Sequence, residues 1–248
     1  MQLEHADLNL LGHRQENQDR ALTIADDRAA LLAVVDGMGG HADGALAAET
    51  AVASMRDAFE SQPHPLFDPD GFLHLTIGRA HDAVVELGHG LPLEARPRAT
   101  CALCLVQDGH AYLAHVGDSR VYLLRGGEVF ERTRDHSHVE LLLRSGKITE
   151  EQALAHPMRN YVECCIGGDP VLPEMTLSGR RALVPGDVLL LCTDGFWSGV
   201  TEAQIAALAH AERGSLGGAL EELAVRAVRS NAPFADNTTA TAFRWYGP

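Results

Sequence analysis

Hydrophobic positions along the chain gather in short runs of Val, Leu, Ala and Cys, each ending near Asp, Gly or Ser. Runs of this length and composition are typical of strands buried in a core. They predict strands over residues 29–35, 99–106, 111–116, 121–124 and 188–192. Elsewhere apolar residues recur every three or four positions, with Gly or Pro between the segments, which is typical of helices. This spacing predicts helices over residues 45–59, 72–87, 139–144, 201–208 and 216–228.

The order of these elements is mixed and does not alternate strand with helix. Short turns such as Gln107-Asp108-Gly109 and Arg125-Gly126-Gly127 separate neighbouring strands. Because turns this short join antiparallel strands, we expect an α+β layered fold. No internal repeat or domain linker is visible in the sequence, so we expect a single domain over residues 1–248.

The composition is acidic and rich in apolar residues. The 248 residues, 46% of them hydrophobic, are enough for one large core that needs no disulfides. The formal net charge of −14 argues against a nucleic-acid partner, since a phosphate backbone is bound chiefly by Lys and Arg. Mg²⁺ and Mn²⁺ prefer carboxylate oxygens, so part of this negative charge is suited to holding metal ions.

The five cysteines do not form the pattern of a secreted disulfide framework. Their number is odd and most lie in apolar runs, which fits a reducing cytoplasm. Cys101 and Cys104 form a C-x-x-C pair, but this spacing in a strand places them on opposite faces and disfavours redox or zinc chemistry. The sequence shows no signal peptide, and no run approaches the roughly 18 apolar residues of a membrane span. We therefore expect a cytoplasmic protein without an anchor.

Four separated aspartates share one sequence context. Each lies where an apolar strand runs into a turn, or beside Gly or Asn: Asp36, Asp118, Asp194 and Asp236. A carboxylate just beyond a buried strand is held rigidly and still faces solvent, and a following Gly lets a backbone carbonyl approach as a further ligand. A single Asp-Gly pair is better explained as a turn. The combination favours carboxylates that hold two divalent ions, an arrangement suited to hydrolysing a phosphate ester.

Seven short motifs follow one another along the chain. They are Arg14-Gln15-Glu16-Asn17-Gln18-Asp19, Val35-Asp36-Gly37-Met38-Gly39-Gly40-His41, Gly117-Asp118-Ser119-Arg120, Asp135-His136-Ser137, His156-Pro157, Thr193-Asp194-Gly195 and Asp236-Asn237. In content, order and spacing the chain resembles the metal-dependent protein phosphatases of the PPM, or type 2C, family, in their bacterial stand-alone form. This resemblance spans nearly the whole chain. It implies a four-layer αββα sandwich of two antiparallel sheets flanked by helices, with the metals in the cleft where the strand ends meet.

The resemblance also implies roles for the acidic residues. Asp36 would bridge two ions of Mn²⁺ or Mg²⁺. Asp194 and Asp236 would complete one metal site, and the Gly37 carbonyl would complete the other together with Asp36. Asp118 and Asp194 would hold a weaker third ion.

Arg14 matches the phosphate-binding arginine of the family. A planar guanidinium pairs bidentately with phosphate oxygens, and the alternative role for Arg14 is an ordinary surface salt bridge. The implied reaction is an in-line attack on phosphorus by a metal-activated water, with Arg14 and the metals neutralising charge on the transferring oxygens. No Cys-x5-Arg signature surrounds any cysteine, so no covalent phosphoenzyme is expected.

The chain departs from many eukaryotic relatives at two positions. Gln18 stands where they carry glutamate, and because a neutral amide cannot replace a carboxylate's charge, we rank neighbouring Asp19 above it as a metal ligand. Met38 stands where they carry a histidine proposed as general acid, and methionine cannot donate a proton. Bacterial members share this methionine. His41, a metal-bound water or another group is left to protonate the leaving alkoxide, and the alternative role for His41 is to cap the following helix.

Residues 137–166 match the mobile flap that family members place beside the active site. His136 precedes this segment and Ser137 opens it, so both are candidate acid or flap residues. A flap would influence substrate choice and the third metal. The alternative is a plain helical insertion, and the sequence does not separate the two.

Two other functions fit parts of the sequence. A non-catalytic relative that binds phosphoproteins would usually lack one of Asp36, Asp194 or Asp236, and all three are present. A two-metal nuclease is disfavoured by the acidic charge and by the lack of a basic stripe. We therefore expect a monomeric phosphatase of phosphoserine and phosphothreonine in proteins. Its partners would be phosphorylated proteins and a Ser/Thr kinase that it opposes, and not nucleic acid or membrane.

Overall fold

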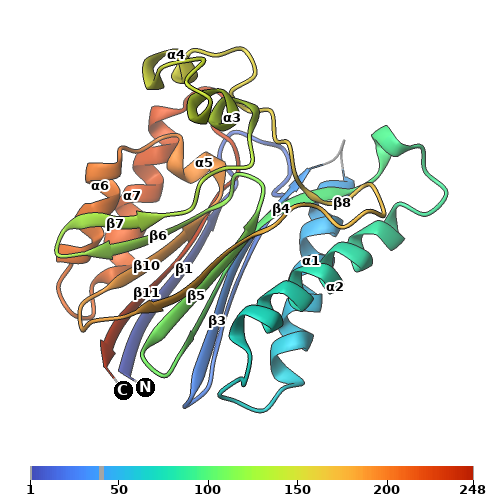
Figure 1. Cartoon of the computed structure of the whole chain (residues 1–248). Coiled ribbons are helices and arrows are strands. Elements are labelled where there is room, and N and C mark those ends of the chain that lie inside the picture. The colour runs from blue at the N-terminus through green and yellow to red at the C-terminus, as the bar shows by residue number, and fades with distance from the viewer. Residues whose placement is uncertain (1, 39–41, 248) are drawn as a thin grey trace.

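Two antiparallel sheets lie face to face and helices cover both outer faces (Figure 1). The computed structural model describes residues 2–38 and 42–247. One sheet has the strand order β1-β11-β10-β6-β7, and the other has the order β2-β3-β4-β5-β9 with β8 paired to β4. Helices α1 and α2 cover the second sheet, and α5, α6 and α7 cover the first (Figure 1). This is the expected αββα sandwich.

The strands are β1 (Gln2–Leu10), β2 (Asp19–Ala25), β3 (Ala29–Met38), β4 (Arg98–Gln107), β5 (His110–Val116), β6 (Arg120–Arg125), β7 (Glu128–Arg132), β8 (Ile166–Gly167), β9 (Thr176–Ala182), β10 (Val188–Cys192) and β11 (Thr238–Gly247). The α-helices are α1 (Ala42–Glu60), α2 (Pro69–Leu87), α3 (His138–Arg144), α4 (Glu150–Leu154), α5 (Asp194–Trp197), α6 (Glu202–Ala206) and α7 (Leu216–Ser230). Two short 3-10 helices, η1 (Leu93–Ala95) and η2 (Ala207–His210), complete the described elements.

Strand β3 is buried on both of its faces. Leu31 and Val35 pack in the layer shared with α1 and α2, whereas Leu32 and Val34 pack between the two sheets. Successive side chains of a strand point to opposite faces, so a strand inside a sandwich must be apolar at every position. Each such Leu or Val stabilises the fold by about 1.5–3 kcal/mol. The continuous apolar run in the sequence therefore reflects a central strand.

The C-x-x-C pair follows the same rule. Cys101 packs toward the helices and Cys104 packs between the sheets, as the spacing predicted. Burial raises the pKa of the Cys101 thiol to about 12. All five cysteines of the chain lie in the described residues and are free thiols.

Both predicted hairpin turns are present. The β4–β5 turn has positive φ at Asp108 and Gly109, and the β6–β7 turn has positive φ at Gly126 and Gly127. Two adjacent residues with positive φ match the right-handed twist of the paired strands. The helix predicted over residues 201–208 differs in detail: its α-helical part ends at Ala206 and the chain continues as η2. Within the described ranges, none of the helices has the length and apolar character needed to cross a membrane.

Candidate active site

A cavity of about 880 Å³ contains all four aspartates of the sequence pattern. Its walls are formed by Arg14, Gln15, Glu16, Gln18, Asp36, Gly37, Met38, Asp118, Asn160, Val162, Asp194, Asp236 and Asn237. Asp36 comes from the second sheet, whereas Asp194 and Asp236 come from the ends of β10 and β11 in the first. Asp118 lies in the turn between β5 and β6. The packing of two sheets thus brings together carboxylates that are far apart in the chain.

Asp36 lies inside its strand and not just beyond it, which corrects the expected position. Strand β3 continues to Met38, and Asp36 is aligned with Asp19 on β2 and with Thr100 on β4. Paired strands on both sides hold the backbone of Asp36. Its carboxylate is therefore fixed more firmly than a turn residue would be.

Gly37 occupies a position that only glycine fits. A Cβ atom built there would lie 1.9 Å from the carbonyl oxygen of Gly44, and the Gly37 N–H donates to the carbonyl of Gln18 over 3.1 Å. The start of α1 and the loop before β2 therefore press directly against β3. Gly37 also lines the cavity, and the use of its carbonyl as a metal ligand stays a prediction.

Burial and mutual repulsion disfavour negative charge in the cavity. Burial raises the pKa of Asp36 and of Asp118 well above the usual range, and neighbouring aspartates raise both further. Burial, followed by the charge of Asp236, raises the pKa of Asp194 to about 6, although Arg14 acts in the opposite direction. Cations would relieve this repulsion. An all-oxygen donor set of this kind suits Mg²⁺ or Mn²⁺.

The carboxylates share a cavity without converging on one point. Among residues 2–38 and 42–247, no three His, Cys, Asp or Glu side chains form a ready-made ligand set. Asp236 is instead bound by its neighbours: Oδ2 lies 2.5 Å from Nη2 of Arg14, and Oδ1 accepts the N–H of Asn237. The cavity-lining groups are nevertheless mostly carboxylate and amide oxygens, the donor type that Mg²⁺ and Mn²⁺ prefer.

Asp19 and Gln18 occupy different environments. Asp19 is 1% exposed, is not among the cavity-lining residues, and accepts a 2.7 Å hydrogen bond from the hydroxyl of Thr193. Burial raises the pKa of its carboxyl to about 7. Gln18 does line the cavity. The geometry therefore favours Gln18 at the cavity wall, and the assignment of Asp19 as a ligand stays a prediction.

The other candidate residues lie outside the cavity wall or outside the described residues. His136 contacts the N–H of Gly117 and the hydroxyl of Thr176, and Ser137 caps α3 through the N–H of Glu140. His41 lies outside the described residues. The segment 137–166 does reach the cavity, through Asn160 and Val162, which the sequence did not single out.

Asn237 organises the loop that carries Arg14. Its Oδ1 accepts the N–H of Gln18, and its Nδ2 donates to the carbonyls of Leu11 and Glu16. Sequence reasoning used this residue only as part of the Asp236-Asn237 motif. An amide placed directly after a candidate ligand was the available signal for a loop-holding role.

An αββα sandwich with a cavity lined by four aspartates and an arginine is the arrangement of a metal-dependent phosphatase. Residues 11–215 match the family described as protein phosphatase 2C, and the chain belongs to this family.

Named relatives and solved structures agree with this family. The protein phosphatase PhpP of Streptococcus pneumoniae serotype 2 is 31% identical over 199 residues, which cover 79% of each chain. The serine/threonine phosphatase structure of S. agalactiae has a TM-score of 0.88 at 28% identity, covering 98% of this chain and 99% of that one. The catalytic domain of PstP in complex with two manganese ions has a TM-score of 0.81 at 28% identity, covering 99% of each.

Proposed function

We propose that the protein hydrolyses phosphoserine and phosphothreonine in other proteins, with Mn²⁺ or Mg²⁺ as cofactor. The observation that carries the proposal is that Asp36, Asp118, Asp194 and Asp236 line one cavity together with Arg14. Membership of the protein phosphatase 2C family supports the reaction class. The manganese ions of the PstP structure support the choice of cofactor.

The aspartates would be the ligands of two principal metal ions. Asp36 would be the shared ligand, because it lines the same cavity as Asp118, Asp194 and Asp236 and is held on β3 by paired strands on both sides. Asp194 and Asp236 would complete one metal site, the Gly37 carbonyl together with Asp36 would complete the other, and Asp118 with Asp194 would hold a weaker third ion. When bound, such ions supply a water of lowered pKa as the nucleophile and neutralise charge on phosphate oxygens.

Arg14 would bind and orient the phosphate. Its side chain is 57% exposed and that of Asp236 is 36% exposed, so their ion pair is screened by solvent and readily exchanged. The guanidinium can then present two N–H groups to the phosphate oxygens. Met38 lines the same cavity but has no proton to donate, so His41 or a water would protonate the leaving alkoxide.

The cellular setting forms part of the proposal. Five free cysteines are compatible with a reducing compartment, which supports a cytoplasmic location. We further propose that the monomer is the working unit, which the elution volume of the purified protein in size-exclusion chromatography would test. Hydrolysis of phosphoserine and phosphothreonine would oppose a Ser/Thr kinase, and phosphoproteomics with and without the active enzyme would name the substrates.

Phosphate release from a phosphoserine peptide tests the proposal. The protein should release phosphate with Mn²⁺, stop when a chelator is added, and lose nearly all turnover in Asp36→Asn or Asp194→Asn. Asp82→Asn, an exposed position on α2, is the matched control and should keep full activity. Preferential hydrolysis of nucleotides over phosphopeptides, or full activity in Asp36→Asn, would overturn it.

A further inference from the structure

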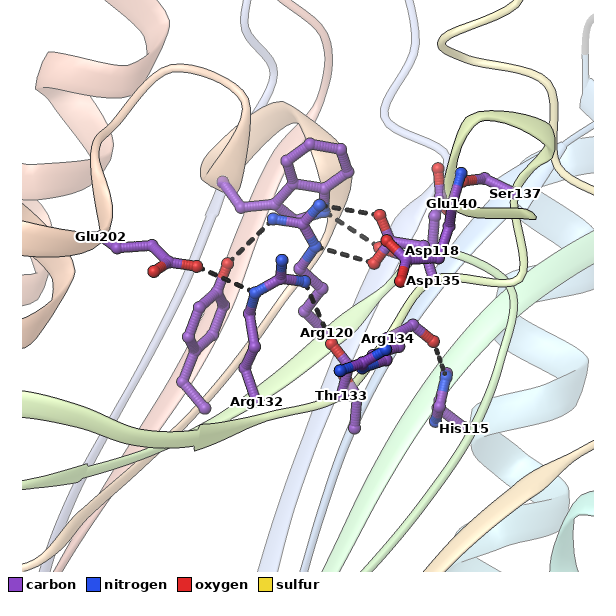
Figure 2. A network of polar contacts seen from close by, with 12 residues as sticks. His115, Asp118, Arg120, Arg132, Thr133, Arg134, Asp135, Ser137, Glu140 and Glu202 are labelled. Carbon is purple, nitrogen blue, oxygen red and sulfur yellow. Dashed lines mark hydrogen bonds and ion pairs between the residues drawn. The ribbon is translucent and has the colours of Figure 1, made fainter. Parts of the chain in front are cut away.

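A buried ion pair stands beside the turn that carries Asp118 (Figure 2). Arg120 donates through Nε to Oδ1 of Asp135 at 2.8 Å and through Nη2 to Oδ2 at 2.7 Å. The two side chains are only 14% and 8% exposed. Nη1 of Arg120 donates to the hydroxyl of Tyr122. The guanidinium therefore has a single fixed orientation.

Trp197 connects this guanidinium to Asp118. Cζ of Arg120 lies over its ring, 3.5 Å from the ring centroid. From this position the indole Nε1–H donates a 2.9 Å hydrogen bond to the backbone carbonyl of Asp118. Since Trp has one donor and no acceptor, this bond fixes which edge of the indole faces the turn.

The same turn is also hydrogen-bonded by His136, the residue that precedes the segment 137–166. The N–H of His136 donates to the carbonyl of Gly117 at 2.8 Å, and the N–H of Gly117 is 3.3 Å from Nδ1 of His136. Because Asp135 is held by Arg120, the base of the segment and the turn are tied to one guanidinium. Trp197 also ends α5, the helix that begins with Asp194.

We propose that Trp197, oriented by Arg120 and Asp135, is a positioning residue that sets the carboxylate of Asp118 against that of Asp194. This inference rests on the proposed function, in which Asp118 and Asp194 hold a cation. Trp197 acts on Asp118 through its backbone carbonyl. In a tight turn, fixing the carbonyl fixes the backbone dihedral angles, and these set the direction in which the carboxylate points.

Trp197→Phe is the sharpest variant. It keeps an aromatic face over Arg120 and removes the indole donor together with one ring of the side chain. Substitution of Arg120 or Asp135 would leave a buried unpaired charge and endanger folding. Trp197→Leu, which also lacks a side-chain donor, serves as the second variant if Trp197→Phe does not fold. Trp245→Phe, in the layer between the sheets, is the matched control.

Calorimetric titration of each variant with Mn²⁺ alone measures the effect without relying on turnover. Trp197→Phe should weaken the Mn²⁺ binding event that depends on Asp118 about fivefold, the effect of one net hydrogen bond. In an Asp118→Asn background, the same substitution should change Mn²⁺ binding by less than about twofold, because a residue acting through Asp118 has nothing left to position. Trp245→Phe should bind Mn²⁺ like the wild type.

The outcomes separate the two claims. If the wild type binds no Mn²⁺, the proposed function fails and this inference with it. If the wild type binds Mn²⁺ but Trp197→Phe binds it equally well, only the positioning role is overturned. If Trp197→Phe weakened Mn²⁺ binding by the same factor in the wild-type and Asp118→Asn backgrounds, the positioning role would also be overturned. Such an additive effect would mean that Trp197 supports the fold in general and does not act through Asp118.

Discussion

Arg14 forms an ion pair with Asp236 that a bound phosphate could replace. Their ion pair is short, at 2.5 Å, but both side chains keep contact with solvent. Exposed pairs contribute about 0–1 kcal/mol, so a phosphate can compete for the guanidinium at little cost. The two residues are 222 positions apart, and the sequence identified both without revealing that they touch.

Arg14→Lys should lower kcat/KM for a phosphopeptide about 10- to 100-fold. Lysine keeps the charge but loses the planar fork, and a hydrogen bond to a charged group contributes about 1.5–3 kcal/mol. Steady-state kinetics at saturating Mn²⁺ measures the effect. Arg229→Lys, at the exposed end of α7, is the control and should be neutral. Unchanged kinetics in Arg14→Lys would argue against bidentate phosphate binding.

Gly37→Ala should destabilise the fold by at least about 1–3 kcal/mol and abolish activity. The added methyl group would lie 1.9 Å from the Gly44 carbonyl oxygen, so the start of α1 must move. Gly218→Ala, on α7 with no atom within 4 Å of the new Cβ, should instead stabilise by about 0.5–1 kcal/mol. Urea denaturation of both variants checks the contrast, and equal stabilities would contradict the close packing.

At the scale of elements, predictability depended on burial. Strand β3 is apolar on both faces and stood out as a continuous run. Strand β1 was not predicted, because it is an edge strand with one exposed face. Ala6 and Leu8 face the core, while His5 and Asp7 are exposed. That alternation was the available signal. Strand β11 was not predicted either, because its first residues are mostly Thr and show no clear apolar pattern.

Leu220→Ala should test how α7 is held on its sheet. Leu220 is 1% exposed and, with Leu216, Leu223 and Ala224, forms the stripe that packs on β1 and β11. Truncating a buried Leu costs about 2–5 kcal/mol. Because Leu220 does not line the cavity, activity per folded molecule should be unchanged. Glu221→Ala, exposed on the same helix, should shift the urea midpoint very little.

At the scale of the whole molecule, the sandwich concentrates acidic groups in one desolvated place. The four aspartates and their order were predictable from the sequence. Their depth of burial and the electrostatic repulsion between their carboxylates were not. Burial raises the pKa of Asp19 to about 7 and that of Asp194 to about 6, and the pKa of Asp36 and Asp118 well above the usual range. The fold therefore carries a cost at neutral pH that cations would offset.

The metal-free protein should lose stability as pH rises. Carboxyls whose pKa is raised by folding bind more protons in the folded state, so their contribution is complete below about pH 4 and is lost as pH rises through about 6 to 7. Asp36→Asn removes a carboxyl whose pKa is raised by burial and by neighbouring carboxylates, so it should be more stable than the wild type at pH 8, with a smaller difference at pH 5. Chemical denaturation in chelator measures both. A difference that does not grow with pH would contradict the coupling.

The most direct test of the central claim is anomalous diffraction from crystals soaked in Mn²⁺. We expect two strong manganese peaks in the cavity, with the carboxylate of Asp36 between them and with Asp194, Asp236 and the Gly37 carbonyl as further ligands. Asp36→Asn crystals should lose at least one peak. Manganese peaks confined to other parts of the molecule, or a cavity with no peak at saturating Mn²⁺, would contradict the account.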